Sequence, residues 1–268
     1  MTDAEQTAPA AQLPSADQTP AQERYGLEVL AVLGVSLGMS GIYAFLSFLR
    51  TQITIPGGFA NASVSVISQS KSSYPLLDLA DALADILHGV LPAFLAIVLL
   101  MRTPGGPGYG IGWDRSRLGR EFAQGMAFCA LIGIPGLTLV WIGRQLGFNA
   151  SIVVVDFPDI WYRVPVLLLS ALQNGLVEEV VVVAYLLTRL RQMGWSNQRA
   201  LAVSALLRGS YHLYQGYGGF VGNLVMGLIF GWWFQRTRRV LPLVFAHFLL
   251  DGFSFVGYIY LHNHVSWL

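Results

Sequence analysis

The chain has 268 residues, of which 54% are hydrophobic and only 12% are charged. Soluble domains carry about 25% charged residues, so this composition excludes an ordinary soluble domain and a disordered chain. Sixteen Lys and Arg residues are balanced by 15 Asp and Glu, for a net charge of +1. That balance excludes the basic stripe that a nucleic-acid partner would need. The remaining class is a membrane protein whose main partner is the lipid bilayer.

The first 24 residues form a distinct segment. They contain four acidic residues, a single arginine and many Ala, Pro, Gln and Thr residues. A secretory signal would begin with basic residues followed by a short apolar core, and neither feature is present. We interpret residues 1–24 as a disordered cytoplasmic tail and residues 25–268 as a single transmembrane helical domain.

Seven segments of this domain are apolar enough to cross a bilayer, which takes about 20 residues of helix. The fifth is the shortest and the least apolar. The pattern predicts an all-α fold, a polytopic membrane bundle of about seven transmembrane helices. In chain order the segments are Tyr25–Phe48, Leu76–Met101, Phe122–Leu146, Val164–Leu190, Gln198–Tyr214, Tyr217–Phe234 and Val240–Leu261.

The basic residues between these segments predict the orientation, because cytoplasmic loops carry an excess of Lys and Arg. One side has Arg24, Arg102, Arg115, Arg117, Arg120, Arg189, Arg191, Arg199, Arg236, Arg238 and Arg239. The other side has only Arg50, Lys71, Arg144 and Arg163. We therefore expect an integral membrane protein, in the plasma membrane of a prokaryote, with its N-terminus in the cytoplasm and its C-terminus outside.

Two adjacent carboxylates lie near the middle of the fourth segment. They are Glu178 and Glu179, and Asn174 lies one turn before Glu178 on the same helical face. A carboxylate at the centre of a bilayer costs roughly 2.5–3.5 kcal/mol on insertion scales. The glutamates are therefore expected to face a polar cavity or charged partners on other helices.

Two later segments carry charged pairs spaced by one helical turn. Arg208 and His212 share a face of the fifth segment, and His247 and Asp251 share a face of the seventh. A carboxylate one turn from a histidine can orient the ring and raise its basicity, which is the role expected of Asp251. Since polar groups on three helices cannot all face lipid, we expect them to meet around one cavity.

The second segment has a polar face of its own. Asp78, Asp81, Asp85 and His88 recur at spacings of three and four residues, which places them on one side of a helix. The expected role of this face is a wetted helix end or the lining of a cavity rather than catalysis.

Two glutamates and two histidines suit two forms of hydrolysis. A glutamate can act as a general base on water while the histidines orient that water or stabilise an oxyanion. Alternatively, Glu178, His212 and His247 could hold a divalent metal ion such as zinc that activates the water. A proton relay in a transporter would use the same residue types. The residues leave the cofactor open.

These motifs resemble the CPBP family of intramembrane proteases. That family includes the type II CAAX prenyl endopeptidases and the bacteriocin-processing and self-immunity proteins, also called the Abi family. Its pattern is EExxxR, then FxxxH, then HxxxN or a related polar residue. The resemblance covers about Leu168–Val256, within a family core expected at about 164–261.

The resemblance implies roles for residues at the matching positions. Glu178, Glu179, His212 and His247 correspond to the proposed catalytic groups, and Asp251 to their support. The family describes these groups either as metal ligands or as a metal-free glutamate-and-water site. Asn174 and Arg208 are the further supporting residues that we expect beside them.

The sequence departs from the family pattern at two positions. Val183 stands where the arginine of the first motif is expected, and Arg208 stands where the second motif has phenylalanine. One arginine is lost and another is gained one turn before His212. We therefore predict that Arg208 supplies the missing countercharge to Glu179 across the interface between two helices.

The function expected from the resemblance is that of an intramembrane endopeptidase similar to the type II CAAX prenyl endopeptidases. It would hydrolyse a peptide bond of a membrane-associated peptide or protein, in or near the membrane. The main alternative is a non-catalytic membrane scaffold or immunity-type partner that retains the fold, and the missing arginine is the observation that favours it. A proton-coupled transporter is a third alternative, although matched pairs of broken helices are not evident.

Overall fold

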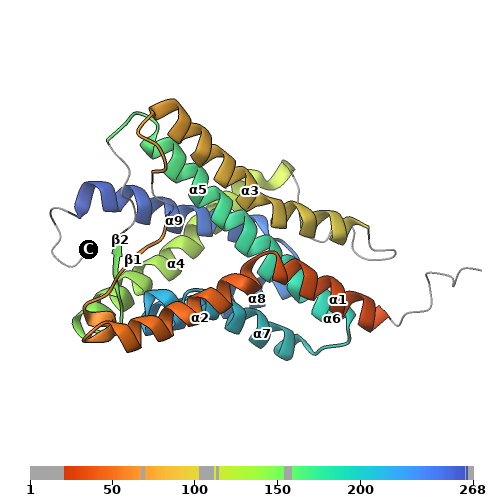
Figure 1. The fold of residues 1–268 in the computed structure, drawn as a ribbon. Helices are drawn as coiled ribbons and strands as arrows, with labels where there is room; N and C mark the ends of the chain where they lie inside the picture. The colour runs from red at the N-terminus through yellow and green to blue at the C-terminus, as the bar shows by residue number, and fades with distance from the viewer. Residues whose placement is uncertain are drawn as a thin grey trace, which may run out of the picture.

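A computed structural model describes residues 21–67, 70–102, 112, 115–153, 159–262 and 264, and the chain is mostly helical in these ranges (Figure 1). The α-helices are α1 (Ala21–Gly34), α2 (Leu37–Thr54), α3 (Pro75–Met101), α4 (Leu118–Gln145), α5 (Arg163–Val177), α6 (Leu186–Gln192), α7 (Asn197–Tyr211), α8 (Tyr217–Thr237) and α9 (Leu241–Leu261). A π-helical segment, η3 (Glu178–Tyr185), joins α5 to α6. The short elements are η1 (Gly58–Ala60), η2 (Arg115–Arg117), η4 (Leu213–Gln215) and two parallel strands, β1 (Ser63–Ser65) and β2 (Ser151–Val153).

The helices confirm a polytopic helical membrane protein. Within the described ranges five helices are long and apolar enough to cross a membrane: α3, α4, the continuous α5–η3–α6 helix, α8 and α9. The bent pair of α1 and α2 makes a sixth candidate if it counts as one span. The fifth predicted span, Gln198–Tyr214, corresponds to α7, which has 15 residues and does not meet these criteria.

Although α7 is short, it runs from one end of the bundle to the other. At its start, the Gln235 side chain near the end of α8 donates a hydrogen bond to the Asn197 carbonyl (2.9 Å). At its far end, the turn into α8 meets the segment after α4, where the Ala150 amide donates to the Gln215 carbonyl (3.0 Å). The chain thus reverses at opposite ends of the bundle before and after α7. Neighbouring helices pack around α7, which is too short and too polar to be a span by itself.

The first predicted span is not one helix. Its two halves, α1 and α2, meet at an angle of 53°. The hydroxyl of Ser36 at the break donates to the Val32 carbonyl (2.5 Å), a side-chain contact that commonly bends helices. Helix α1 also begins at Ala21, inside the segment expected to be a disordered tail, while residues 1–20 lie outside the described part.

The α5–η3–α6 helix is the centre of the bundle. Two thirds of its most apolar window (67%) is buried inside the protein, compared with 11% for α3 and for α4. Its π-helical part is entirely buried, and residues Val181–Leu187 have no exposed surface. A π-helix widens the turn and frequently occurs at functional sites. Here it begins at Glu178, so the two glutamates lie where other helices surround them.

One end of this central helix is fastened by Arg189, whose side chain is 1% exposed. Its guanidinium donates to Glu28 of α1 (2.6 Å), to Gln192 (2.8 Å) and to the Leu99 carbonyl at the end of α3 (2.8 Å). Tyr185 also donates to Glu28 (2.9 Å). This network holds α1 and α3 against α6, at the end of the bundle that carries most of the arginines.

Candidate active site

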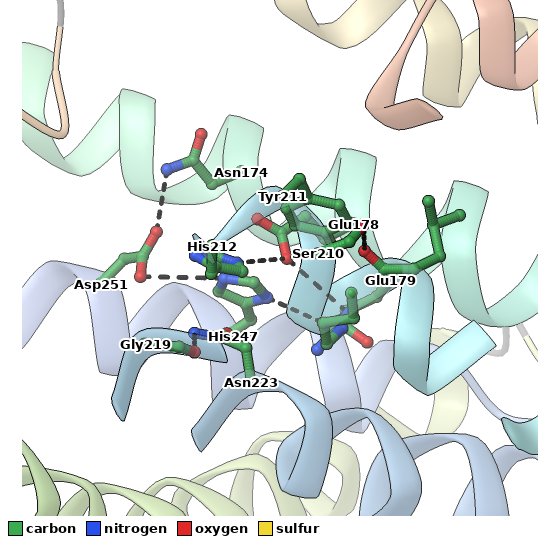
Figure 2. A network of polar contacts seen from close by, with 12 residues as sticks. Asn174, Glu178, Glu179, Ser210, Tyr211, His212, Gly219, Asn223, His247 and Asp251 are labelled. Carbon is green, nitrogen blue, oxygen red and sulfur yellow. Dashed lines mark hydrogen bonds and ion pairs between the residues drawn. The ribbon is translucent and has the colours of Figure 1, made fainter. Parts of the chain in front are cut away.

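The innermost part of the site is a buried ion pair between two helices. A guanidinium nitrogen of Arg208 on α7 lies 2.5 Å from a carboxylate oxygen of Glu179 on η3, and neither side chain has exposed surface. The predicted contact between these residues is therefore present. The same oxygen of Glu179 lies 2.7 Å from Nδ1 of His247 on α9, so that three helices meet at one carboxylate (Figure 2).

Glu178 lies beside this pair and is more open, with 10% of its side chain exposed. The Tyr211 hydroxyl donates to its Oε2 atom (2.8 Å), and Nε2 of His212 lies 3.6 Å from the same oxygen. Arg208 is 3.9 Å away. Sequence reasoning missed Tyr211 as a site residue. Its position three residues after Arg208 was an available signal, because that spacing places both side chains on one face of α7.

Asp251 lies close to side chains of two helices. It accepts a hydrogen bond from the Asn174 amide of α5 (2.9 Å), and its other oxygen is 3.8 Å from Nε2 of His247. The ring of His247 is also held through Nδ1 by Glu179 (2.7 Å). Asp251 thus lies one turn from His247, as expected, and the closer contact to the ring comes from Glu179 on the facing helix.

Several buried polar atoms of the site have no hydrogen-bond partner among the described residues. They are both ring nitrogens of His212, Oε2 of Glu179, and Nε and Nη1 of Arg208. Buried polar groups are normally paired with protein or with ordered water. Their concentration around Glu178 and Glu179 indicates a place where water or a polar group of a substrate completes the hydrogen bonding.

Glu178, His212 and His247 are the residues expected to hold a metal ion. Within the described ranges no group of three His, Cys, Asp or Glu side chains is arranged to hold a metal ion. Glu178, His212 and His247 are therefore not arranged as a three-ligand metal centre in the part of the chain that the structure describes.

The polar face expected on α3 is divided between three environments. Asp78 is buried and accepts hydrogen bonds from the Ser70 hydroxyl, the Lys71 amide and the Tyr162 hydroxyl. Asp81 and Asp85 line a cavity between α3 and α5. His88 is exposed and does not line that cavity. The expected cavity lining is thus found for the aspartates and not for the histidine.

Comparison with protein families identifies the part of the chain that contains this site. Residues 160–253 match the model of the family described as Type II CAAX prenyl endopeptidase Rce1-like. These residues form an Rce1-like domain. This domain begins before α5 and ends within α9, and it includes all of the residues that are labelled in Figure 2. Comparisons with curated proteins and with solved structures gave no match.

The Rce1-like domain confirms the resemblance found in the sequence. The matched range contains Glu178, Glu179, His212 and His247, the residues that carried the resemblance. The description of the matched family names an endopeptidase, so the match over residues 160–253 points to a protease that acts on protein. The family domain is the part of the protein in which α5, η3, α7 and α9 bring these side chains together (Figure 2).

Proposed function

We propose that the protein is an intramembrane endopeptidase in which Glu178 activates a water molecule. The observation that carries this proposal is the pairing of Glu178 with His212. Their nearest polar atoms are 3.6 Å apart, beyond a direct hydrogen bond, and both ring nitrogens of His212 lack a partner among the described residues. A water molecule between the two side chains would satisfy both of them.

The proposed reaction follows from these positions. Glu178 takes a proton from the water, and the oxygen adds to the carbonyl carbon of the scissile peptide bond. His212 orients the water and donates toward the oxyanion that forms on the carbonyl oxygen. Glu178 then returns the proton to the leaving nitrogen as the C–N bond breaks, which yields a carboxylic acid and an amine.

Glu179 has a positioning role in this proposal. Its carboxylate is fully buried and is held by Arg208 on one side and by His247 on the other. That arrangement keeps a positive charge close to Glu178, whose Oε2 is 3.9 Å from Arg208. The hydrogen bond from the Tyr211 hydroxyl occupies one lone pair of the Glu178 carboxylate. It also holds that carboxylate close to His212.

The Glu178→Gln variant tests this function. Glutamine keeps an acceptor for Tyr211 but cannot take a proton, and a general base contributes typically 10²–10⁴-fold to a rate. We expect the variant to fold and to lose cleavage by that factor. The measurement is a comparison of new peptide termini in membranes that hold equal amounts of folded wild-type and variant protein.

Asp159→Asn is the matched control, because it removes a fully exposed carboxylate outside the site. It should produce the same termini as the wild type. If Glu178→Gln also produces them, Glu178 is not the base and the proposal fails.

The non-catalytic alternative loses its main support in this geometry. It rested on the arginine missing at position 183, and Arg208 contacts the glutamate from the next helix instead. We also propose a membrane-associated peptide or protein as substrate, which the match to an endopeptidase family supports. The proposed location is the plasma membrane of a prokaryote with the arginine-rich end in the cytoplasm, because cytoplasmic loops carry an excess of basic residues.

A further inference from the structure

A cavity lies between α3 and α5, on the side of the bundle where α3 begins. Its volume is about 190 Å³. The walls combine apolar side chains, such as Ile86 and Val166, with polar ones from α3 and α5. A wider hollow of about 450 Å³ lies nearer the end of the bundle, and Lys71 lines both spaces. The two hollows are therefore neighbours that share the Lys71 side chain in their walls.

The cavity reaches the proposed active site through Asn174. This residue lines the cavity and donates its hydrogen bond to Asp251, which lies 3.8 Å from His247 (Figure 2). Gln173 lines the same wall. The wall of the cavity at Asn174 therefore adjoins the group of side chains that leads to His247.

The charge of the cavity is unbalanced. Asp78 is satisfied by hydrogen bonds from the preceding loop, and Asp85 forms an ion pair with Lys71 (2.5 Å). Among the described residues Asp81 has neither a hydrogen bond nor an ion pair, although it lines the cavity and is half-buried. Three carboxylates therefore face one ammonium group. The hydrogen bond to Asp85 raises the pKa of Lys71, which keeps that ammonium charged.

We propose that this cavity is a subsite that selects a basic side chain of the substrate, a Lys or Arg close to the scissile bond. The proposal rests on the function proposed above and names the substrate class for it. Asp81 binds the cation, and Asp85 becomes available to it when Lys71 swings away. A substrate with a carboxylate at this position is repelled, because like charges in a partly dry cavity are costly.

Binding of two synthetic peptides to Glu178→Gln protein in lipid vesicles tests the subsite separately from catalysis. The peptides are apolar, carry blocked ends and a dye, and differ only in a central Lys or norleucine. We expect the Lys peptide to bind on the order of tenfold more tightly. Asp81→Asn should abolish that difference, and Lys71→Met should increase it, because it removes the internal competitor for Asp85. Asp159→Asn, an exposed site outside the cavity, should leave it unchanged.

The outcomes separate the two proposals. Equal binding of both peptides, or a Lys preference that survives Asp81→Asn, overturns the subsite. Cleavage of both peptides at equal rates by the wild type also overturns it, while leaving the endopeptidase in place. A Lys preference that depends on Asp81, together with identical termini from wild type and Glu178→Gln, supports the subsite and rejects Glu178 as the base.

Discussion

At the scale of single residues, the ion pair of Arg208 and Glu179 was predictable because the sequence departs from the family pattern at two positions. An arginine is absent at position 183 and present at 208, and a buried carboxylate needs a countercharge. The contacts of His247 were not predictable in the same way. Helical spacing favoured Asp251 as its partner, whereas the approach of Glu179 depends on how α9 packs against η3.

The buried pair gives a prediction about stability. Arg208→Leu leaves Glu179 charged and buried without its closest partner, and removing one member of such a pair costs about 3–5 kcal/mol. We expect a large fall in unfolding temperature in detergent, together with loss of cleavage. Arg208→Lys should restore part of the stability, since an ammonium can still reach one oxygen.

A double substitution provides the control for this prediction. Arg208→Leu combined with Glu179→Leu removes both charges, and its stability should lie well above that of Arg208→Leu alone. Stabilities that simply add in the double variant would show that the two residues do not interact.

At the scale of elements, most helices could be predicted from apolar length, and their boundaries agree with the expected segments within a few residues. The π-helical segment η3 could not be predicted from the sequence in this way. Its sequence, Glu-Glu followed by four valines, is compatible with an ordinary helix, and its wider turn depends on neighbours. One such neighbour is Ser204 of α7, whose buried hydroxyl donates to the Val182 carbonyl (2.7 Å). This bond ties the valine run to the helix that carries Arg208.

Ser204→Ala tests whether that tie matters. A hydrogen bond of this kind contributes about 0.5–1.5 kcal/mol to stability. We expect a lower unfolding temperature and slower cleavage, because η3 and α7 carry the two sides of the site.

Ser254→Ala is the matched control for this variant. Its hydroxyl is exposed and bonds only to the Leu250 carbonyl of its own helix. It should change neither quantity. A Ser204→Ala protein that behaves like the Ser254→Ala protein would show that η3 keeps its shape without the bond.

At the scale of the whole molecule, the alternation of the chain between two ends was predictable from basic residues and apolar lengths together. The structure places Arg189 and the start of α7 at one end, and Lys71 and Tyr162 at the other. The status of α7 was not predictable, because its 15 residues are too few for a free span and only its neighbours show that it crosses the bundle.

The orientation can be measured with single cysteines. The chain has one cysteine, the partly buried Cys129, so that Cys129→Ala provides a cysteine-free background. We expect Asp159→Cys to react with a membrane-impermeant maleimide in intact cells, and Arg199→Cys to react only after the cells are opened. The opposite pattern would place the N-terminus outside.

The shortness and polarity of α7 also bear on how the protein is made. A segment of this kind has little tendency to enter a bilayer when it leaves the translocation machinery by itself. We expect it to enter together with α8, as a hairpin. Before α7 and α8 insert, Glu179 cannot contact Arg208. Before α9 inserts, Glu179 cannot contact His247 either. In the proposed endopeptidase, a nascent chain would therefore lack a complete catalytic site until its last helices have inserted, which would protect it and neighbouring proteins from early cleavage.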